Sequence, residues 1–268
     1  MSKVLLEKQG HVAVVTINRP EARNALDPET VVGLAACWVR IRDDDDIRVA
    51  LVTGAGDLAF CAGADLKRLV PLYNGERQAQ DEWDERLLAD RSLIGTAMLR
   101  SFDVTKPVIA AVNGFAVGGG MELVMGTDLR IASTEARFGL QEVLWGLFPS
   151  GGSTVRLPRQ IPCVRAMELM LTGDLIEARQ AHELGFLNRI VAPGDVLAAA
   201  SRLAEKIARR APLSVRAIRR SVRACSGLPE EDALAVEQEI ADGVFASQDA
   251  IEGARAFRER RAPVFKGV

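Results

Sequence analysis

The segment from Asn113 to Glu122, NGFAVGGGME, constrains this chain more than any other. It follows an apolar, strand-like run at 107–112 and precedes a segment with helical character. Its consecutive glycines let a ligand approach the backbone and leave helix-start N–H groups free to face it. Free N–H donors beside the carboxylate of Glu122 suit a reaction that builds negative charge on one oxygen and moves a proton nearby. A flexible helix start with a dipole-favoured Glu is the structural alternative.

The composition is that of an ordinary globular protein. The 268 residues are 48% hydrophobic and 26% charged, with a net charge of −2. Such a balance gives no reason to expect nucleic acid or a membrane as the main partner. The start of the chain has no basic region followed by an apolar core, and no apolar run approaches the roughly 20 residues that span a bilayer. We therefore expect a cytoplasmic protein of one large or two small domains.

Neither the cysteines nor the histidines form a recognisable site. Cys37, Cys61, Cys163 and Cys225 are scattered without C-x-x-C spacing, which fits thiols in a reducing compartment better than disulfides or a zinc site. The only histidines, His11 and His182, lie in a strand-like and a helical pattern, so structural roles are favoured. Acid–base chemistry would then fall to carboxylates.

Two other motifs are weak. The acidic run 43–46 lacks the alternating ligands and central glycine of a Ca²⁺ loop and is interpreted as a solvated turn. Gly54-x-Gly56 lacks the third glycine and the immediate helix of a dinucleotide fingerprint, so it is poor evidence for NAD.

The hydrophobic pattern predicts an α/β core at 1–195 followed by a helical region at 196–268. Asp27 and Pro28 start a helix that the pattern extends to Val39. The further expected elements are strands at 12–17, 49–53, 108–112, 129–132 and 136–138, one long helical stretch at 77–99, and tail helices at 196–210, 213–225, 230–246 and 248–261.

The tail carries a basic cluster, composed of Arg209, Arg210, Arg216, Arg219, Arg220 and Arg223. At helical spacing such a cluster is typical of a solvated face. A nucleic-acid-binding stripe would normally come with a basic domain.

Three segments in order resemble the enoyl-CoA hydratase/isomerase family, the crotonase superfamily. They are FCAGADL at 60–66, the glycine segment at 113–122, and FGLQEV at 138–143 followed by GLFPSGG at 146–152. NRPEARNAL at 18–26 and LTGD at 171–174 agree with it, so the resemblance covers essentially the whole chain. It implies a spiral of β-β-α repeats with a C-terminal helical region that mediates trimer formation, as a homotrimer or a dimer of trimers.

The resemblance also implies roles for individual residues. The backbone N–H groups of Ala64 and Gly119 match the family's oxyanion hole, which binds the thioester oxygen of an acyl-CoA. Glu122 and Glu142 match the two glutamates of its hydratases, and which one is acid and which base stays open. The positions expected to bind the substrate are Ala22, Arg23, Ala62, Asp65, Leu66, Lys67 and Gly118. No metal or cofactor is expected beyond the CoA of the substrate.

The expected function is hydration of a trans-2-enoyl-CoA to a 3-hydroxyacyl-CoA. Double-bond isomerisation or dehydration of a specialised acyl-CoA is the alternative on the same site, and a non-catalytic binding relative is the alternative of another class. Two departures leave the acyl group open. Gln141 stands where many family members have Pro, and the segment between Lys67 and Lys106 is longer than in compact short-chain hydratases.

Overall fold

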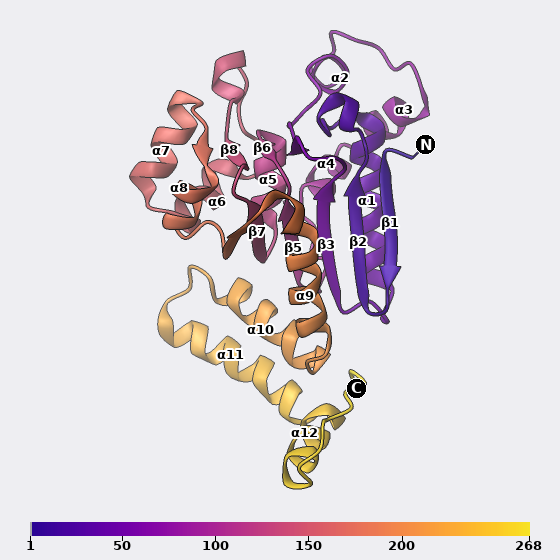
Figure 1. Cartoon of the computed structure of the whole chain (residues 1–268), viewed down its shortest axis with the longest axis vertical. Coiled ribbons are helices and arrows are strands. Elements are labelled where there is room, and N and C mark those ends of the chain that lie inside the picture. The colour runs from indigo at the N-terminus through magenta and orange to yellow at the C-terminus, as the bar shows by residue number, and fades with distance from the viewer. Residues whose placement is uncertain (1) are drawn as a thin grey trace.

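The computed structural model describes residues 2–268 and contains two β-sheets (Figure 1). The larger sheet has the order β1-β2-β3-β5-β7-β10 and the smaller one β4-β6-β8-β9. Neighbouring strands are parallel except for β1–β2 and β8–β9. The strands are β1 (Val4–Gln9), β2 (Val12–Ile17), β3 (Val49–Gly54), β4 (Ala59–Cys61), β5 (Val108–Val112), β6 (Phe115–Val117), β7 (Leu129–Ser133), β8 (Arg137–Gly139), β9 (Ile176–Glu177) and β10 (Arg189–Val191).

The chain builds the two sheets together, one strand of each per turn. β3 is followed by β4, β5 by β6 and β7 by β8, and helices return the chain to the larger sheet after each pair. This confirms the predicted spiral of β-β-α repeats. Because the β4, β6 and β8 strands are adjacent, the segments that follow them in three successive turns lie at the same end of the small sheet.

The helices are α1 (Pro28–Asp43), α2 (Leu69–Tyr73), α3 (Glu82–Ala89), α4 (Ser92–Ala97), α5 (Gly119–Gly126), α6 (Ser153–Gln160), α7 (Cys163–Thr172), α8 (Ala178–Glu183), α9 (Val196–Ala208), α10 (Pro212–Cys225), α11 (Glu230–Phe245) and α12 (Gln248–Arg258). Short 3₁₀ turns occur at η1 (Pro20–Ala22), η2 (Glu142–Trp145) and η3 (Pro193–Asp195). Within residues 2–268 no helix is both long enough and apolar enough to cross a membrane.

The larger sheet is buried on both faces. Val15 and Val52 point to the main core that includes Trp38 of α1, whereas Val14 and Leu51 point to a second cluster covered by α9. This alternation follows from the period of two in strands. The first helix of the 196–268 region therefore packs on the sheet, and α10 to α12 extend beyond it (Figure 1).

Two sequence predictions about helix starts and ends fare differently. The carboxylate of Asp27 accepts a hydrogen bond from the N–H of Thr30 at 3.0 Å, which confirms the predicted cap of α1, although the helix runs on to Asp43. The single long helix predicted at 77–99 is wrong, because α3 and α4 are separate helices. Asp81 caps α3, and Asp90 accepts from the N–H of Ser92 at 3.0 Å. Aspartates that bond to nearby backbone favour helix starts over helix interiors.

The basic cluster of the tail does not lie wholly on a solvated face. The side chain of Arg219 is 8% exposed, and it pairs with Asp128 at 2.8 Å and with Asp103 at 2.5 Å. Arg223 also pairs with Asp128, at 3.0 Å. These ion pairs hold α10 against the loops that precede β5 and β7, so part of the cluster fixes the helical region to the core.

The side chain of Lys106 caps the carboxyl end of α1 from the interior of the protein. Its fully buried ammonium donates to the carbonyl oxygens of Ile41 (2.6 Å), Arg42 (3.1 Å) and Asp44. The carbonyls of Ile41 and Arg42 belong to the last turn of α1, where the helix supplies no donor for them. Burial lowers the pKa of this lysine.

We expect Lys106→Met to destabilise the protein by roughly 2–3 kcal/mol, because it leaves the buried carbonyl of Ile41 and the partly buried carbonyl of Arg42 without this donor. Lys8→Met is the matched control, since Lys8 pairs with Asp44 and Asp46 at the exposed surface of the same turn. Urea denaturation of both variants measures the difference. Equal midpoints for Lys106→Met and wild type would contradict the capping role.

Candidate active site

The start of α5 is pressed against the loop that follows β4. Gly118, with φ 54°, ends the strand segment, and its N–H donates to the carbonyl of Gly139 on β8 at 2.9 Å. A side chain at Gly120 would overlap the carbonyl oxygen of Cys61. A Cβ at Gly63 would lie 3.2 Å from the nitrogen of Gly119. The glycines therefore allow a contact between backbones that no larger residue permits.

This contact brings the two predicted donors, Ala64 and Gly119, into neighbouring segments. Gly119 opens α5, so its N–H has no partner within the helix. Ala64 lies between two residues that are both bonded to Leu26: the Leu26 N–H donates to Gly63 O at 2.8 Å, and the Asp65 N–H donates to Leu26 O at 2.9 Å. Within residues 2–268, neither the Ala64 N–H nor the Gly119 N–H donates a hydrogen bond. Two free N–H groups beside a helix start are the type of arrangement that binds a negatively charged oxygen, and this role for Ala64 and Gly119 stays a prediction.

Glu122 lies one turn into α5 and is 5% exposed. Its Oε1 accepts hydrogen bonds from the N–H of Gly151 at 2.6 Å and from the hydroxyl of Ser153 at 2.7 Å. Burial raises the pKa of this carboxyl, while the bonds from Ser153 and Gly151 oppose the rise. Since donors favour the ionised form, they make a buried carboxylate tolerable here.

Glu142 opens the 3₁₀ turn η2 after β8, and its environment differs from that of Glu122. A Cβ at Gly118 would lie 3.1 Å from its Oε1, so the carboxyl group lies against the start of α5. Its Oε2 is buried and has no hydrogen-bond partner among the described residues. Burial raises the pKa of Glu142 to about 7, and the charge of Glu122 adds to the rise. A group with this pKa exchanges protons readily near neutral pH.

The predicted substrate-binding positions surround Ala64. The N–H of Ala62 donates to the carbonyl of Arg23 at 3.0 Å, which joins the η1 segment containing Ala22 to the loop after β4. Arg23, Leu66 and Lys67 are exposed at this rim. Asp65 differs from them, because its carboxylate is engaged within the chain, with Arg19 and with the N–H groups of Lys67 and Arg68. The contacts of all these positions with CoA stay predictions.

Residue patterns did not reveal the partners of Glu122. The sequence pattern marks a glycine-rich loop at 146–152 but gives no reason to select Ser153 directly after it. Its hydroxyl reaches Glu122 only because α6 packs against α5 in the fold. Gln141 is the residue that departs from the family pattern. Its backbone carbonyl accepts a hydrogen bond from the N–H of Leu144 at 3.1 Å, and this bond starts the turn that carries Glu142.

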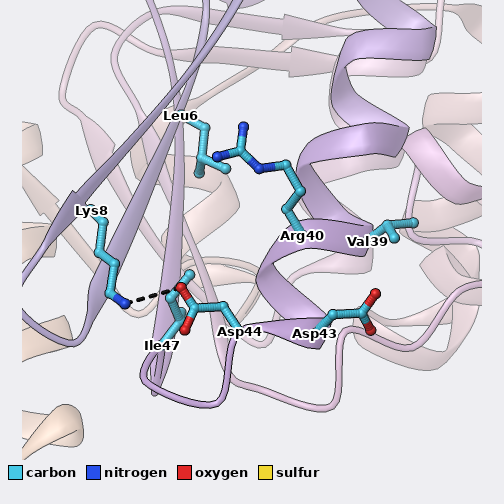
Figure 2. A pocket seen from close by; sticks show the side chains of 7 residues that line it. All are labelled: Leu6, Lys8, Val39, Arg40, Asp43, Asp44 and Ile47. Carbon is cyan, nitrogen blue, oxygen red and sulfur yellow. Dashed lines mark hydrogen bonds and ion pairs between the residues drawn. The ribbon is translucent and has the colours of Figure 1, made fainter.

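A hollow of about 360 Å³ lies elsewhere, between β1 and the end of α1 (Figure 2). It is lined by Leu6, Lys8, Val39, Arg40, Asp43, Asp44 and Ile47. The Lys8 ammonium pairs with Asp44 at 3.0 Å across it. None of the predicted site residues is found there, and the candidate active site remains the one around α5.

Comparison with known proteins decides the family. The sequence model of the "Enoyl-CoA hydratase/isomerase" family matches residues 7–268. The chain belongs to this family. Enoyl-CoA hydratase EchA19 of Mycobacterium tuberculosis is 43% identical over 262 residues, which cover 98% of this chain and 96% of that protein. The (E)-benzylidenesuccinyl-CoA hydratase of Thauera aromatica is 42% identical and covers 99% of both chains.

The solved structures agree with the sequence relatives. The crystal structure of an enoyl-CoA hydratase from Mycobacterium tuberculosis H37Rv superposes with a TM-score of 0.88 at 39% identity and covers 100% of both chains. The crotonase fold that the family resemblance implied is thereby confirmed. Because its relatives at this identity are named enoyl-CoA hydratases, the protein is an enzyme of the hydro-lyase class.

The environment of Glu142 carries a cost in stability that can be measured. Its pKa in the folded protein, about 7, lies above the ordinary value of 4.5, so the native state binds this proton more tightly than the unfolded state does. The stability that this confers is complete below pH 4.5 and is lost as the pH rises to about 7. Glu142→Gln is therefore expected to be more stable than wild type at pH 8, by roughly 1–3 kcal/mol.

Chemical denaturation of the two proteins at pH 4.5 and pH 8 tests this expectation. The difference between them should be small at the lower pH and appear at the higher one. A Glu142→Gln variant that is less stable than wild type at pH 8 would show that the carboxylate is well solvated or paired.

Proposed function

We propose that this protein catalyses the reversible addition of water to a trans-2-enoyl-CoA, which gives a 3-hydroxyacyl-CoA. The observation that carries the proposal is the arrangement around α5, where the buried Glu122 and the partly buried Glu142 lie next to two free backbone N–H groups. An α,β-unsaturated thioester needs both parts. Donors at its carbonyl oxygen make the β-carbon electrophilic, and carboxyl groups handle the protons of the water and of the α-carbon.

In this proposal the N–H groups of Ala64 and Gly119 bind the thioester oxygen. Charge accumulates on that oxygen as the enolate forms, and the dipole of α5 favours it at the helix start. Donors that are already oriented stabilise this charge without reorganisation during the reaction. Loss of one such donor typically costs about 10² to 10³ in rate.

The different environments of the two glutamates support different roles for them. Glu122, which accepts hydrogen bonds from Gly151 and Ser153, is the ionised member and takes a proton from water as the oxygen bonds to the β-carbon. Glu142, whose Oε2 has no donor within residues 2–268, holds the proton and delivers it to the α-carbon. The pair thus begins and ends the reaction with one proton, which has moved from Glu142 to Glu122. Proton exchange with solvent then returns Glu122 to its ionised form and Glu142 to its protonated form.

The CoA portion is proposed to lie along the rim formed by Ala22, Arg23, Ala62, Leu66 and Lys67, with Gly118 beside the acyl group. Arg23 and Lys67 are the exposed cations of this rim, as expected for contacts with phosphate. The chemistry itself calls on no metal or redox group, and CoA is part of the substrate.

A specialised acyl-CoA is the second candidate substrate. One relative is named (E)-benzylidenesuccinyl-CoA hydratase, and another, from Proteus mirabilis, is named carnitinyl-CoA dehydratase and is 39% identical. Both names describe addition or removal of water on a specialised acyl-CoA. The choice between the two candidates lies in the acyl pocket, and the reaction type is common to both.

We further propose that 196–268 forms a helical region that assembles the protein as a homotrimer or a dimer of trimers, beside a core of 1–195. Support comes from a hollow of about 320 Å³ between α10 and α11, lined mainly by apolar side chains. Ile218 and Phe245 at this hollow are 66% and 76% exposed in the single chain. Apolar surface of this kind is usually covered by another protein.

The test of the proposed function follows the loss of enoyl-thioester absorbance with crotonyl-CoA, longer straight-chain enoyl-CoAs and an aromatic enoyl-CoA. Glu122→Gln and Glu142→Gln are each expected to lower kcat by about 10²-fold or more, because a positioned acid or base contributes about 10² to 10⁴. A Glu135→Gln variant, at an exposed carboxylate, is the matched control. Folded wild type that hydrates none of these substrates would refute the proposal.

The pH profile tests the single shared proton. With Glu142 at a pKa of about 7, kcat/KM for hydration should fall tenfold per pH unit above pH 7. Dehydration of the 3-hydroxyacyl-CoA should follow the same profile, since the pair carries one proton in both directions and the overall equilibrium involves only water. A rate that rises through pH 7 would show that both glutamates act ionised.

A further inference from the structure

The loop that carries Ala64 lies between β4 and α2 and has no regular secondary structure to hold its N–H groups. Leu26 holds it from both sides, since it donates to Gly63 O and accepts from the Asp65 N–H. These two bonds fix the peptide groups that flank Ala64. The orientation of its N–H therefore depends on how firmly the segment 19–27 is tied to the segment 62–68.

Arg19 is the side chain that joins the two segments. Its Nη1 donates to the carbonyl of Ala25 at 2.6 Å, and its Nη2 donates to Oδ2 of Asp65 at 3.2 Å. The carboxylate of Asp27, the cap of α1, lies 3.6 Å from the same Nη2. With 11% of its side chain exposed, Arg19 forms these contacts largely out of solvent. The planar fork of a guanidinium reaches several acceptors at once, and a lysine ammonium presents only a point charge.

Asp65 transmits this constraint to the loop. While Oδ2 faces Arg19, Oδ1 accepts from the N–H groups of Lys67 at 3.0 Å and Arg68 at 3.1 Å. Its side chain is 14% exposed. Both carboxylate oxygens are thus committed within the chain, which favours a structural task for Asp65 over a contact with CoA.

We propose that Arg19 and Asp65 are positioning residues for the oxyanion donor of Ala64. Neither touches the reacting atoms. The Arg19–Asp65 pair holds the loop so that the Ala64 N–H keeps its direction toward the thioester oxygen. This inference rests on the proposed function, because that function supplies the oxygen which Ala64 binds.

The test uses Arg19→Lys and Asp65→Asn in the full-length protein. Asn keeps an oxygen for the N–H groups of Lys67 and Arg68 but removes the charge opposite Arg19. We expect kcat to fall by about tenfold to 10²-fold in each variant with KM nearly unchanged, as for a donor displaced by up to about 1 Å. The double variant should lose no more than the worse single one, since both act through the same contact.

A spectroscopic readout separates positioning from a general loss of structure. Hydrogen bonds to the carbonyl of a conjugated thioester shift its absorbance to longer wavelength, so the shift of bound cinnamoyl-CoA reports the donors. Recorded in the Glu122→Gln background, where hydration is blocked, the shift should shrink with Arg19→Lys and with Asp65→Asn. It needs no turnover, so it remains informative if wild type proves not to be a hydratase.

Lys3→Met is the matched control. Lys3 pairs with Asp27 at 2.6 Å, in the same chain of charges but away from Asp65. It should lower thermal stability and leave both kcat and the absorbance shift as in wild type. A full shift and wild-type kcat in Arg19→Lys and Asp65→Asn would overturn the proposal, as would equal losses in Lys3→Met. Absence of hydration by wild type, with the shift still dependent on Arg19, would refute the proposed function and leave the positioning role standing.

Discussion

The site depends on one close contact, between the first turn of α5 and the backbone that follows β4. Helix starts bind anions only where their N–H groups are accessible, and here the helix lies directly against a second segment that contributes another N–H. The contact exists because Gly120 has no side chain to overlap the carbonyl of Cys61. It sets where Gly119 lies relative to Ala64 and where Glu122, on the next turn of α5, enters the protein. The rest of the site is arranged around that position.

The two glutamates show how one fold gives a pair of like groups unlike properties. Glu122 is buried with two donors on one oxygen, whereas Glu142 is partly buried with an oxygen that no described group satisfies. Both surroundings raise the pKa, and the Oε2 without a donor leaves Glu142 as the member that retains a proton near neutral pH. A buried carboxyl without a partner costs stability, and such a cost is typical of groups placed for reaction.

Local patterns in the sequence predicted the parts of the fold that local forces decide. Buried strands such as Val12–Ile17, the Asp27 cap and the glycine turn before α5 all follow from side chains near one another in sequence. The errors arose where one interaction replaced another. Asp90 divides an expected long helix by bonding to Ser92, and Arg219 leaves a face expected to be solvated because Asp103 and Asp128 are brought to it by the fold. The pairing of Ser153 with Glu122 is likewise long-range, so no spacing rule finds it.

The two proposed oxyanion donors are held by different means, and this difference is the reason why we expect side chains far from the reaction to matter. Gly119 belongs to a helix, whose hydrogen bonds orient its N–H without outside help. Ala64 belongs to a loop, and loop backbone keeps a direction only where other groups restrain it. Leu26 provides the backbone part of that restraint, and the Arg19–Asp65 pair provides the charged part. Because the charged pair is largely shielded from water, it holds its geometry better than an exposed pair of the same length. A donor on irregular backbone can then be as well oriented as one on a helix, provided that the side chains behind it are in place.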